Sequence, residues 1–221
     1  MRTAVALSLI VTTAALAQTN GPAPEPAVRA AIECAPRGGL PNVVARAKAG
    51  GPIRVAYLGG SITAAAGWRV WSRQHVQSQF PGVQVAEIRA AIPGTGAEFG
   101  AARLQRDVLD QKPDLIFVEF AVNGAGERRE RAFESMEGIV RQARAANPDV
   151  DLCFVYTLHV PTLGDYQAGR VPWLVERMEQ VADHYGIPSI HFGVDVAARV
   201  AAGTLVFKDA AGTDGDGKGK P

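Results

Sequence analysis

Short apolar runs alternate with amphipathic segments along most of this chain. Five runs are rich in β-branched and aromatic residues, as strands are, and the segments between them repeat apolar residues at helical spacing. The predicted strands are 53–58, 83–88, 114–122, 150–158 and 187–191. The predicted helices are 68–80, 97–110, 128–146, 171–185 and 194–202. Strands that alternate with helices form βαβ units, so the pattern predicts an α/β domain with a parallel sheet covered on both faces.

The N-terminal segment has a different pattern. Arg2 precedes a stretch of apolar and small residues at 4–15, and an A-x-A cleavage motif ends at Ala17. The stretch is too short to span a bilayer, and we expect no membrane span. These features predict a signal peptide at 1–17 and therefore an exported protein, either periplasmic or secreted. A buried core helix is the alternative interpretation.

The rest of the chain divides into three parts. Residues 18–50 begin with several Pro and Ala residues and are expected to form a linker followed by short helices. Residues 51–207 contain the strand–helix repeats and form the predicted domain. Residues 208–221 are rich in Gly, Asp and Lys and predict a flexible tail, because they lack the third ligand position and the closing Glu of a calcium-binding loop.

Charge, glycine spacing and cysteine content narrow the classes of function. The 23 Lys and Arg residues balance 22 Asp and Glu residues, so electrostatics do not favour nucleic acid or an anionic membrane as a partner. No metal or other cofactor is expected, and the glycine spacing from Gly94 to Gly100 misses the dinucleotide-binding pattern by one residue. Export would permit a disulfide, but two free thiols at Cys34 and Cys153 are the favoured prediction. The oligomeric state stays open.

Residues with useful chemistry follow three successive predicted strands. Ser61 lies on a glycine turn between a strand and a helix, Gly94 follows the next strand, and Asn123 follows the third. Ligand sites of open parallel sheets lie beyond the carboxyl ends of the strands. A glycine lets its backbone N–H approach a substrate oxygen, and an Asn amide adds a second donor. The three residues therefore predict a nucleophilic serine beside an oxyanion hole, with ordinary turn residues as the alternative.

The same three segments resemble the SGNH (GDSL-like) serine esterases. The sequence YLGGSIT at 57–63 resembles the first block of that family, in the subgroup that has Gly-Gly-Ser in place of Gly-Asp-Ser. The sequence AIPGTG at 91–96 resembles the second block, and FVEFAVNG at 117–124 resembles the third. Gly124 stands where the family often has Asp. The resemblance extends over about 53–207.

The resemblance implies a fold and a reaction. The implied fold is a flavodoxin-like three-layer α/β/α sandwich with a five-stranded parallel sheet of strand order 2-1-3-4-5. The implied reaction is hydrolysis of small carboxylic esters, often acetyl groups on saccharides, without a cofactor or metal. Ser61 would be the nucleophile. The backbone N–H groups of Ser61 and Gly94 and the Asn123 amide would bind the oxyanion.

The catalytic base of the family comes from an Asp-x-x-His block near the C-terminus, and this sequence contains no such block. The residues three positions before its four histidines are Ser72, Tyr156, Val181 and Pro188. We therefore expect the chain to stop before that block, and this form to be a poor esterase. A non-catalytic carbohydrate-binding or scaffolding relative is the main alternative. A flavodoxin-like nucleotide or flavin binder is a third, but it would need a phosphate-binding loop that the sequence lacks.

Four further residues have weaker assignments. His159 follows the fourth predicted strand on the site side, and we expect it to contact substrate or to replace the missing base. Trp68 and Arg69 begin the helix after Ser61 and are candidate substrate contacts, with core packing and a solvated helix face as alternatives. Glu119 interrupts an apolar strand, so we expect it to pair with an arginine such as Arg103.

Overall fold

The described residues form one six-stranded mixed sheet. The computed structural model describes residues 28–124 and 128–207. The predicted signal peptide, residues 18–27 of the predicted N-terminal segment and the tail from 208 on therefore lie outside the described residues. The strands are β1 (Cys34–Ala35), β2 (Ile53–Gly59), β3 (Val85–Ala91), β4 (Leu115–Glu119), β5 (Asp151–Tyr156) and β6 (Ser189–His191). Their order across the sheet is β1-β6-β5-β4-β2-β3.

This sheet corrects the sequence prediction in two respects. It has six strands instead of five, and it is mixed, because β1 pairs antiparallel with β6. The other neighbouring pairs are parallel, and their order without β1 is β3-β2-β4-β5-β6. The expected order 2-1-3-4-5 therefore does not describe the whole sheet. The sequence missed β1 because a two-residue strand is too short to show a period-two pattern.

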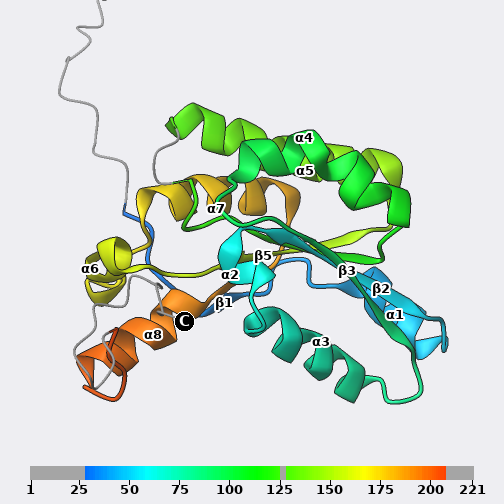
Figure 1. Ribbon diagram of the computed structural model, residues 1–221, viewed down its shortest axis with the longest axis horizontal. Coiled ribbons are helices and arrows are strands. Elements are labelled where there is room, and N and C mark those ends of the chain that lie inside the picture. The colour runs from blue at the N-terminus through cyan, green and yellow to red at the C-terminus, as the bar shows by residue number, and fades with distance from the viewer. Residues whose placement is uncertain (1–27, 125–127, 208–221) are drawn as a thin grey trace, which may run out of the picture.

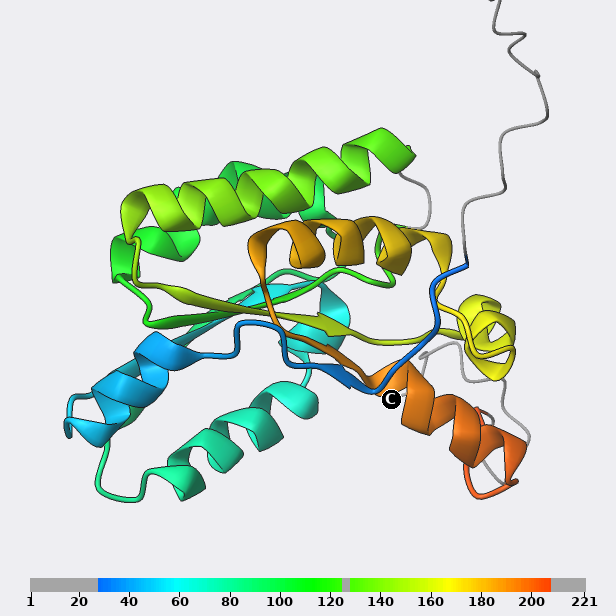
Figure 2. The same ribbon diagram turned by 180° about the vertical axis from the view of Figure 1, so that it is seen from behind.

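Helices cover both faces of the sheet (Figures 1 and 2). Helices α4, α5 and α7 lie on one face, while α1, α3 and α8 lie on the other. The helix bounds are α1 (Pro41–Lys48), α2 (Ser61–Ala64), α3 (Trp68–Gln79), α4 (Ala97–Asp107), α5 (Arg129–Ala146), α6 (Leu163–Gln167), α7 (Trp173–Tyr185) and α8 (Phe192–Ala201). Two short 3₁₀ helices, η1 (Leu109–Gln111) and η2 (Val160–Thr162), complete the set. None of the described helices is long and apolar enough to cross a membrane.

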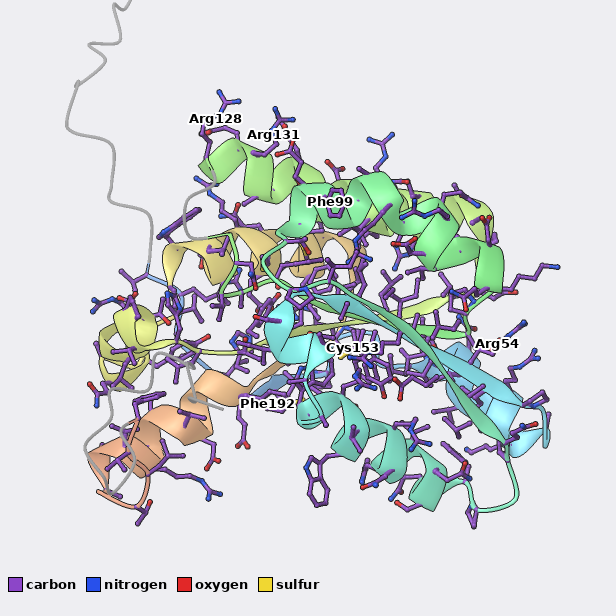
Figure 3. All side chains as sticks on the ribbon, viewed as in Figure 1. Arg54, Phe99, Arg128, Arg131, Cys153 and Phe192 are labelled. Carbon is purple, nitrogen blue, oxygen red and sulfur yellow. The ribbon has the colours of Figure 1, made fainter. Side chains whose placement is uncertain are left out.

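The buried core explains why the apolar runs of the central strands were clear in the sequence. All five residues of β4 and all six of β5 are buried, since both strands lie inside the sheet with helices above and below. Successive side chains point to opposite faces, so Ile116 and Val118 pack under α4, α5 and α7, whereas Phe117 packs toward α1 and α3. Cys153 is buried on the latter side (Figure 3), and burial raises the pKa of its thiol to about 12. Cys34 and Cys153 form no disulfide in the described structure.

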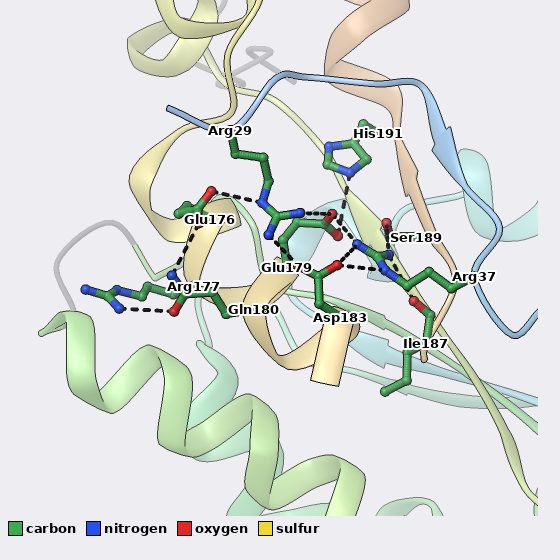
Figure 4. Close-up of polar contacts among 10 residues, drawn as sticks. All are labelled: Arg29, Arg37, Glu176, Arg177, Glu179, Gln180, Asp183, Ile187, Ser189 and His191. Atoms are coloured by element: carbon green, nitrogen blue, oxygen red, sulfur yellow. Dashed lines mark hydrogen bonds and ion pairs between the residues drawn. The ribbon is translucent and has the colours of Figure 1, made fainter. Parts of the chain in front are cut away.

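A network of charged side chains holds the N-terminal segment on α7 (Figure 4). Arg37 donates hydrogen bonds of 2.7 Å to both Glu179 and Asp183. Arg29 donates to Glu176 at 3.0 Å and lies 3.5 Å from Glu179. The partners are separated by more than 140 residues in the chain. The network therefore joins the segment that carries β1 to helix α7.

Glu179 is the most buried member of this network, with only 2% of its side chain exposed. His191, at the end of β6, places Nε2 3.7 Å from the second Glu179 oxygen. Burial acts to raise the pKa of Glu179, but contacts with His191, Arg37 and Ser189 outweigh burial and lower it to about 2. Glu179 is therefore held as a carboxylate inside the protein.

Candidate active site

Ser61 lies where the sequence predicted, on the turn that follows a central strand. The last residue of β2 is Gly59, Gly60 caps the next helix, and Ser61 is the first residue of the short helix α2. Two backbone hydrogen bonds of 3.0 Å close this turn, from Ala64 N–H to the Gly60 carbonyl and from Ala65 N–H to the Ser61 carbonyl. Ser61 is exposed, so its hydroxyl is accessible to a substrate.

The Asn123 side chain lies directly against this turn. A Cβ atom added to Gly60 would stand 2.3 Å from Asn123 Oδ1, a distance that real Cβ atoms do not reach. Asn123 Oδ1 is buried and has no hydrogen-bond partner among the described residues. The structure therefore brings together the loops after β2 and β4, as the site prediction required.

Gly94 lies on the third loop, after β3. Its φ of 75° is in the left-handed region that favours glycine. The loop is tied to the nucleophile turn, because the Ile92 N–H donates to the Gly59 carbonyl at 3.0 Å. Gly94 itself is exposed, so its backbone can be approached from solvent. The three predicted residues thus lie on three loops at the carboxyl edge of neighbouring strands β3, β2 and β4.

The close contact between Gly60 and Asn123 makes a testable prediction. We expect Gly60→Ala to displace Asn123 or the turn, and to lower any Ser61-dependent ester hydrolysis by at least about tenfold, since small misplacements of catalytic groups have large kinetic effects. The measurement is the rate of 4-nitrophenyl acetate hydrolysis. The matched control is Gly67→Ala, because a Cβ at Gly67 would meet nothing within 4 Å. Equal rates in the two variants would contradict the proposed contact.

Glu119 does not pair with Arg103, contrary to the sequence prediction. Its Oε2 accepts a 2.8 Å hydrogen bond from the Thr63 hydroxyl, and its Oε1 accepts one of the same length from Thr157. Arg103 instead donates to Asp107 at 3.0 Å, one helical turn away. The prediction was wrong because two threonine hydroxyls meet the hydrogen-bonding needs of the buried carboxyl, so no cation is required.

Trp68 and Arg69 make contacts with other residues inside the domain. The Trp68 ring packs edge-on against Tyr57 and Phe117, with ring centroids 5.5 and 5.8 Å away. Arg69 is buried, donates to the Thr63 carbonyl at 2.9 Å and forms an ion pair with Glu87. These contacts favour core packing over a solvated helix face, and Arg69 also supports the end of α2.

His159 is the N-cap residue of the 3₁₀ helix η2, in the loop after β5. Its Nδ1 lies 3.3 Å from the Thr162 hydroxyl, and partial burial lowers the pKa of its ring. A neutral ring is the form that accepts a proton. Its predicted contact with substrate stays a prediction.

An exposed aromatic ring near the Gly94 loop was missed by the sequence analysis. Phe99 lies in the first turn of α4, five residues after Gly94, and half of it is exposed. Figure 3 shows it beside the N-terminal part of α5, where Arg131 lies. The available signal was an aromatic residue in the turn that directly follows a predicted site loop. Within the described residues, no group of three or more His, Cys, Asp or Glu side chains could hold a metal ion.

The layers and the three loops define the class of protein. An α/β sheet with a serine, a glycine and an asparagine on adjacent loops at its carboxyl edge is the arrangement of the SGNH hydrolases. Residues 57–216 match the model of the GDSL-like Lipase/Acylhydrolase family, and the chain belongs to this family.

Solved structures agree with this assignment. A two-domain esterase (CEX) active on acetylated mannans is 28% identical, with a TM-score of 0.63 over 76% of this chain and 44% of that one. The same esterase co-crystallised with mannopentaose gives 28% identity and a TM-score of 0.62, over 75% of this chain and 44% of that one. This chain thus spans less than half of the length of that esterase. A lipase/acylhydrolase from Enterococcus faecalis shares the fold at 21% identity, with a TM-score of 0.53 over 72% of this chain and 85% of that one. No curated protein matches the chain.

Proposed function

We propose that this protein is an exported serine esterase that removes small acyl groups, acetyl above all, from saccharides. The observation that carries the proposal is the contact between Asn123 and Gly60, the residue before the exposed Ser61. The saccharide substrate is inferred from the similar esterase that is active on acetylated mannans. Export is inferred from the signal-peptide pattern at 1–17.

The proposed reaction is acyl transfer through Ser61. The Ser61 oxygen attacks the ester carbonyl carbon, the C=O electron pair moves to the oxygen, and the serine proton passes to a base. The N–H groups of Ser61 and Gly94 and the Asn123 amide bind the oxyanion. When the tetrahedral intermediate collapses, the alcohol leaves with a proton, and water then hydrolyses the acyl-serine by the same steps. His159 is a candidate base, since the Asp-x-x-His motif does not identify one.

Acetate release from acetylated mannooligosaccharides tests the proposal. We expect release that depends on Ser61 and is blocked by a serine-directed organophosphate. Isothermal titration with the same oligosaccharide separates this function from the alternative. Binding without any Ser61-dependent release of acetate would support a non-catalytic carbohydrate-binding relative instead.

The oxyanion role of Asn123 makes a second prediction. We expect Asn123→Ala to lower kcat for acetyl ester hydrolysis by roughly 10²-fold, the usual effect of losing one oxyanion donor. KM should change little, because the donor binds charge that develops only in the transition state. The control is Asn147→Ala, which removes an amide after α5 that accepts from the Asp149 N–H. An unchanged kcat in folded Asn123→Ala would remove this residue from the mechanism.

A further inference from the structure

The most buried carboxyl near the site has no cationic partner among the described residues. Glu119 is 0% exposed, and both of its oxygens accept hydrogen bonds from neutral threonine hydroxyls at 2.8 Å. Arg103, the partner expected from the sequence, directs its guanidinium to Asp107 and lies 3.5 Å from the Gly59 carbonyl. Burial raises the pKa of Glu119, and hydrogen bonds from Thr157, Thr63 and the Ala121 N–H oppose that rise.

The three donors to Glu119 come from the turn that carries Ser61, the turn that carries Asn123 and the start of the loop that carries His159. Thr63 belongs to α2, two residues after Ser61. Ala121 lies on the turn after β4, two residues before Asn123. Thr157 directly follows β5 and precedes the loop that carries His159. One carboxyl group therefore joins the nucleophile turn, the oxyanion turn and the next loop across strands β2, β4 and β5.

The packing around Glu119 leaves the nucleophile turn little freedom. A Cβ at Gly59 would lie 2.4 Å from the Thr63 hydroxyl and 2.8 Å from the Glu119 carbonyl oxygen. Thr63 is itself 0% exposed, so its hydroxyl has no solvent partner to replace Glu119. The position of α2 relative to β4 is thus set by a hydrogen bond that cannot be exchanged for water.

Burying this carboxyl is unfavourable for stability. A buried polar group must recover its lost hydration through hydrogen bonds, and an apolar network of similar volume is often as stable as a buried polar one. The hydrogen bonds to Glu119 lie where the turns that carry Ser61 and Asn123 meet the loop that carries His159. Buried hydrogen bonds behind a site commonly hold reactive groups in a fixed geometry. The two oxygens of Glu119 therefore link the turns that carry Ser61 and Asn123.

We propose that Glu119 is a positioning residue, which holds Ser61 and Asn123 in register by accepting hydrogen bonds from Thr63 and Ala121. The proposal rests on the proposed function in that Ser61 is taken as the nucleophile. Glu119 does not contact substrate. It acts through α2 and through the turn after β4, so its removal should change the site geometry more than it changes the strands around the site.

The chain offers a matched control at the opposite edge of the sheet. Asp151 begins β5, is buried, and accepts hydrogen bonds from the Val43 N–H at 2.8 Å and from Asn42 at 3.2 Å. Like Glu119, it is a buried carboxyl with neutral donors and a pKa that burial raises. Asp151→Leu and Asp151→Asn therefore report the general effect of losing such a group, away from the site.

The test compares Glu119→Leu, Glu119→Gln, Thr63→Val and the two Asp151 variants in the full chain. The first measurement is hydrogen exchange at Ala64 and Ala65, whose N–H groups close the Ser61 turn. We expect about tenfold faster exchange there in Glu119→Leu and Thr63→Val, the effect of losing one ordinary hydrogen bond. We also expect Glu119→Gln to retain most of the protection, because a glutamine can still accept from one threonine and donate to the other.

The melting temperature and the exchange of β2 and β4 separate positioning from general stability. We expect Glu119→Leu to lower the melting temperature, because the Thr63 and Thr157 hydroxyls lose their buried acceptor, and to speed exchange more at Ala64 and Ala65 than in β2 and β4. Wild-type exchange at Ala64 and Ala65 in Glu119→Leu would overturn the proposal, and so would an equal rise throughout the two strands. If Glu119→Leu does not fold, Thr63→Val decides by the same criteria, since it removes one hydroxyl at nearly constant volume.

Kinetics provide the second measurement. We expect Glu119→Leu to lower kcat for 4-nitrophenyl acetate by at least about tenfold with KM nearly constant, and Glu119→Gln to restore most of it. The Asp151 variants should keep the wild-type kcat. A wild-type chain without Ser61-dependent hydrolysis would contradict the proposed function alone, and the exchange measurement would still decide the role of Glu119.

Discussion

Replacing Ser61 by alanine is expected to abolish covalent acyl-enzyme formation completely. Ser61 is exposed at the start of α2, next to Gly60, which Asn123 contacts, and alanine has no atom that can attack a carbonyl. The measurement is intact mass after incubation with a fluorophosphonate, which adds one phosphonyl group to an activated serine. The matched control is Ser78→Ala, which removes an exposed hydroxyl on α3 that donates to the His75 carbonyl.

The rate of this labelling also tests the choice of base. Labelling of wild type and Ser78→Ala but not of Ser61→Ala is the expected pattern, with a slow wild-type rate where no base is aligned. Labelling of Ser61→Ala at the wild-type rate would place the nucleophile elsewhere. Fast labelling that is lost in His159→Ala would identify His159 as the base of Ser61.

Removing the buried carboxylate of Glu179 is expected to have the largest effect on stability. Arg37 donates to it at 2.7 Å, and His191 lies beside its second oxygen (Figure 4). Glu179→Leu removes the buried carboxylate from Arg37, which keeps Asp183 as an acceptor, and from His191. Breaking a buried pair in this way costs about 3 to 5 kcal/mol. Urea unfolding measures the loss. The control is Asp195→Asn, which breaks an exposed pair with Arg199 and should change the free energy of unfolding by less than about 1 kcal/mol.

The same residue predicts part of the acid sensitivity of the protein. The folded pKa of Glu179 is about 2, because contacts with His191 and Arg37 outweigh its burial, and its unfolded value is about 4.3. A depressed folded pKa contributes stability that is fully present above the unfolded value and is lost as the pH falls through the folded one. Stability should therefore decrease between about pH 4.3 and pH 2.

Glu179→Gln should reduce the steepness of this decrease without abolishing it. Asp183 also has a lowered pKa, because its contacts with Arg29 and Arg37 outweigh burial, and it remains in the variant. Unfolding free energies measured at several pH values in this range give the slope. Identical slopes in wild type and Glu179→Gln would show that Glu179 is not held as a carboxylate.

The sequence alone determined the alternation of strands and helices and the three loops of the candidate site. Apolar periodicity is a local property, and buried parallel strands such as β4 are apolar at nearly every position. The edge at which the loops meet follows from parallel pairing, so Ser61, Gly94 and Asn123 could be expected together before any coordinates were known. Gly186 was also predictable as the residue that ends α7, and its φ of 66° confirms it.

Only the tertiary structure decided which polar groups meet in the interior. Glu119 was expected to pair with Arg103, but Thr63 and Thr157 lie closer in space although one is 56 and the other 38 residues away in the chain. No local pattern distinguishes a threonine that donates to a buried carboxyl from one on the surface.

The antiparallel strand β1 and the network around Glu179 were equally invisible in the sequence. Arg37 and Glu179 are 142 residues apart, and β1 has two residues, so neither produces a periodic signal. Their pairing arises when the N-terminal segment packs along β6 at the sheet edge. Periodicity indicates which face of an element is buried. The partners of buried charges are set by the packing of elements that lie far apart in the chain.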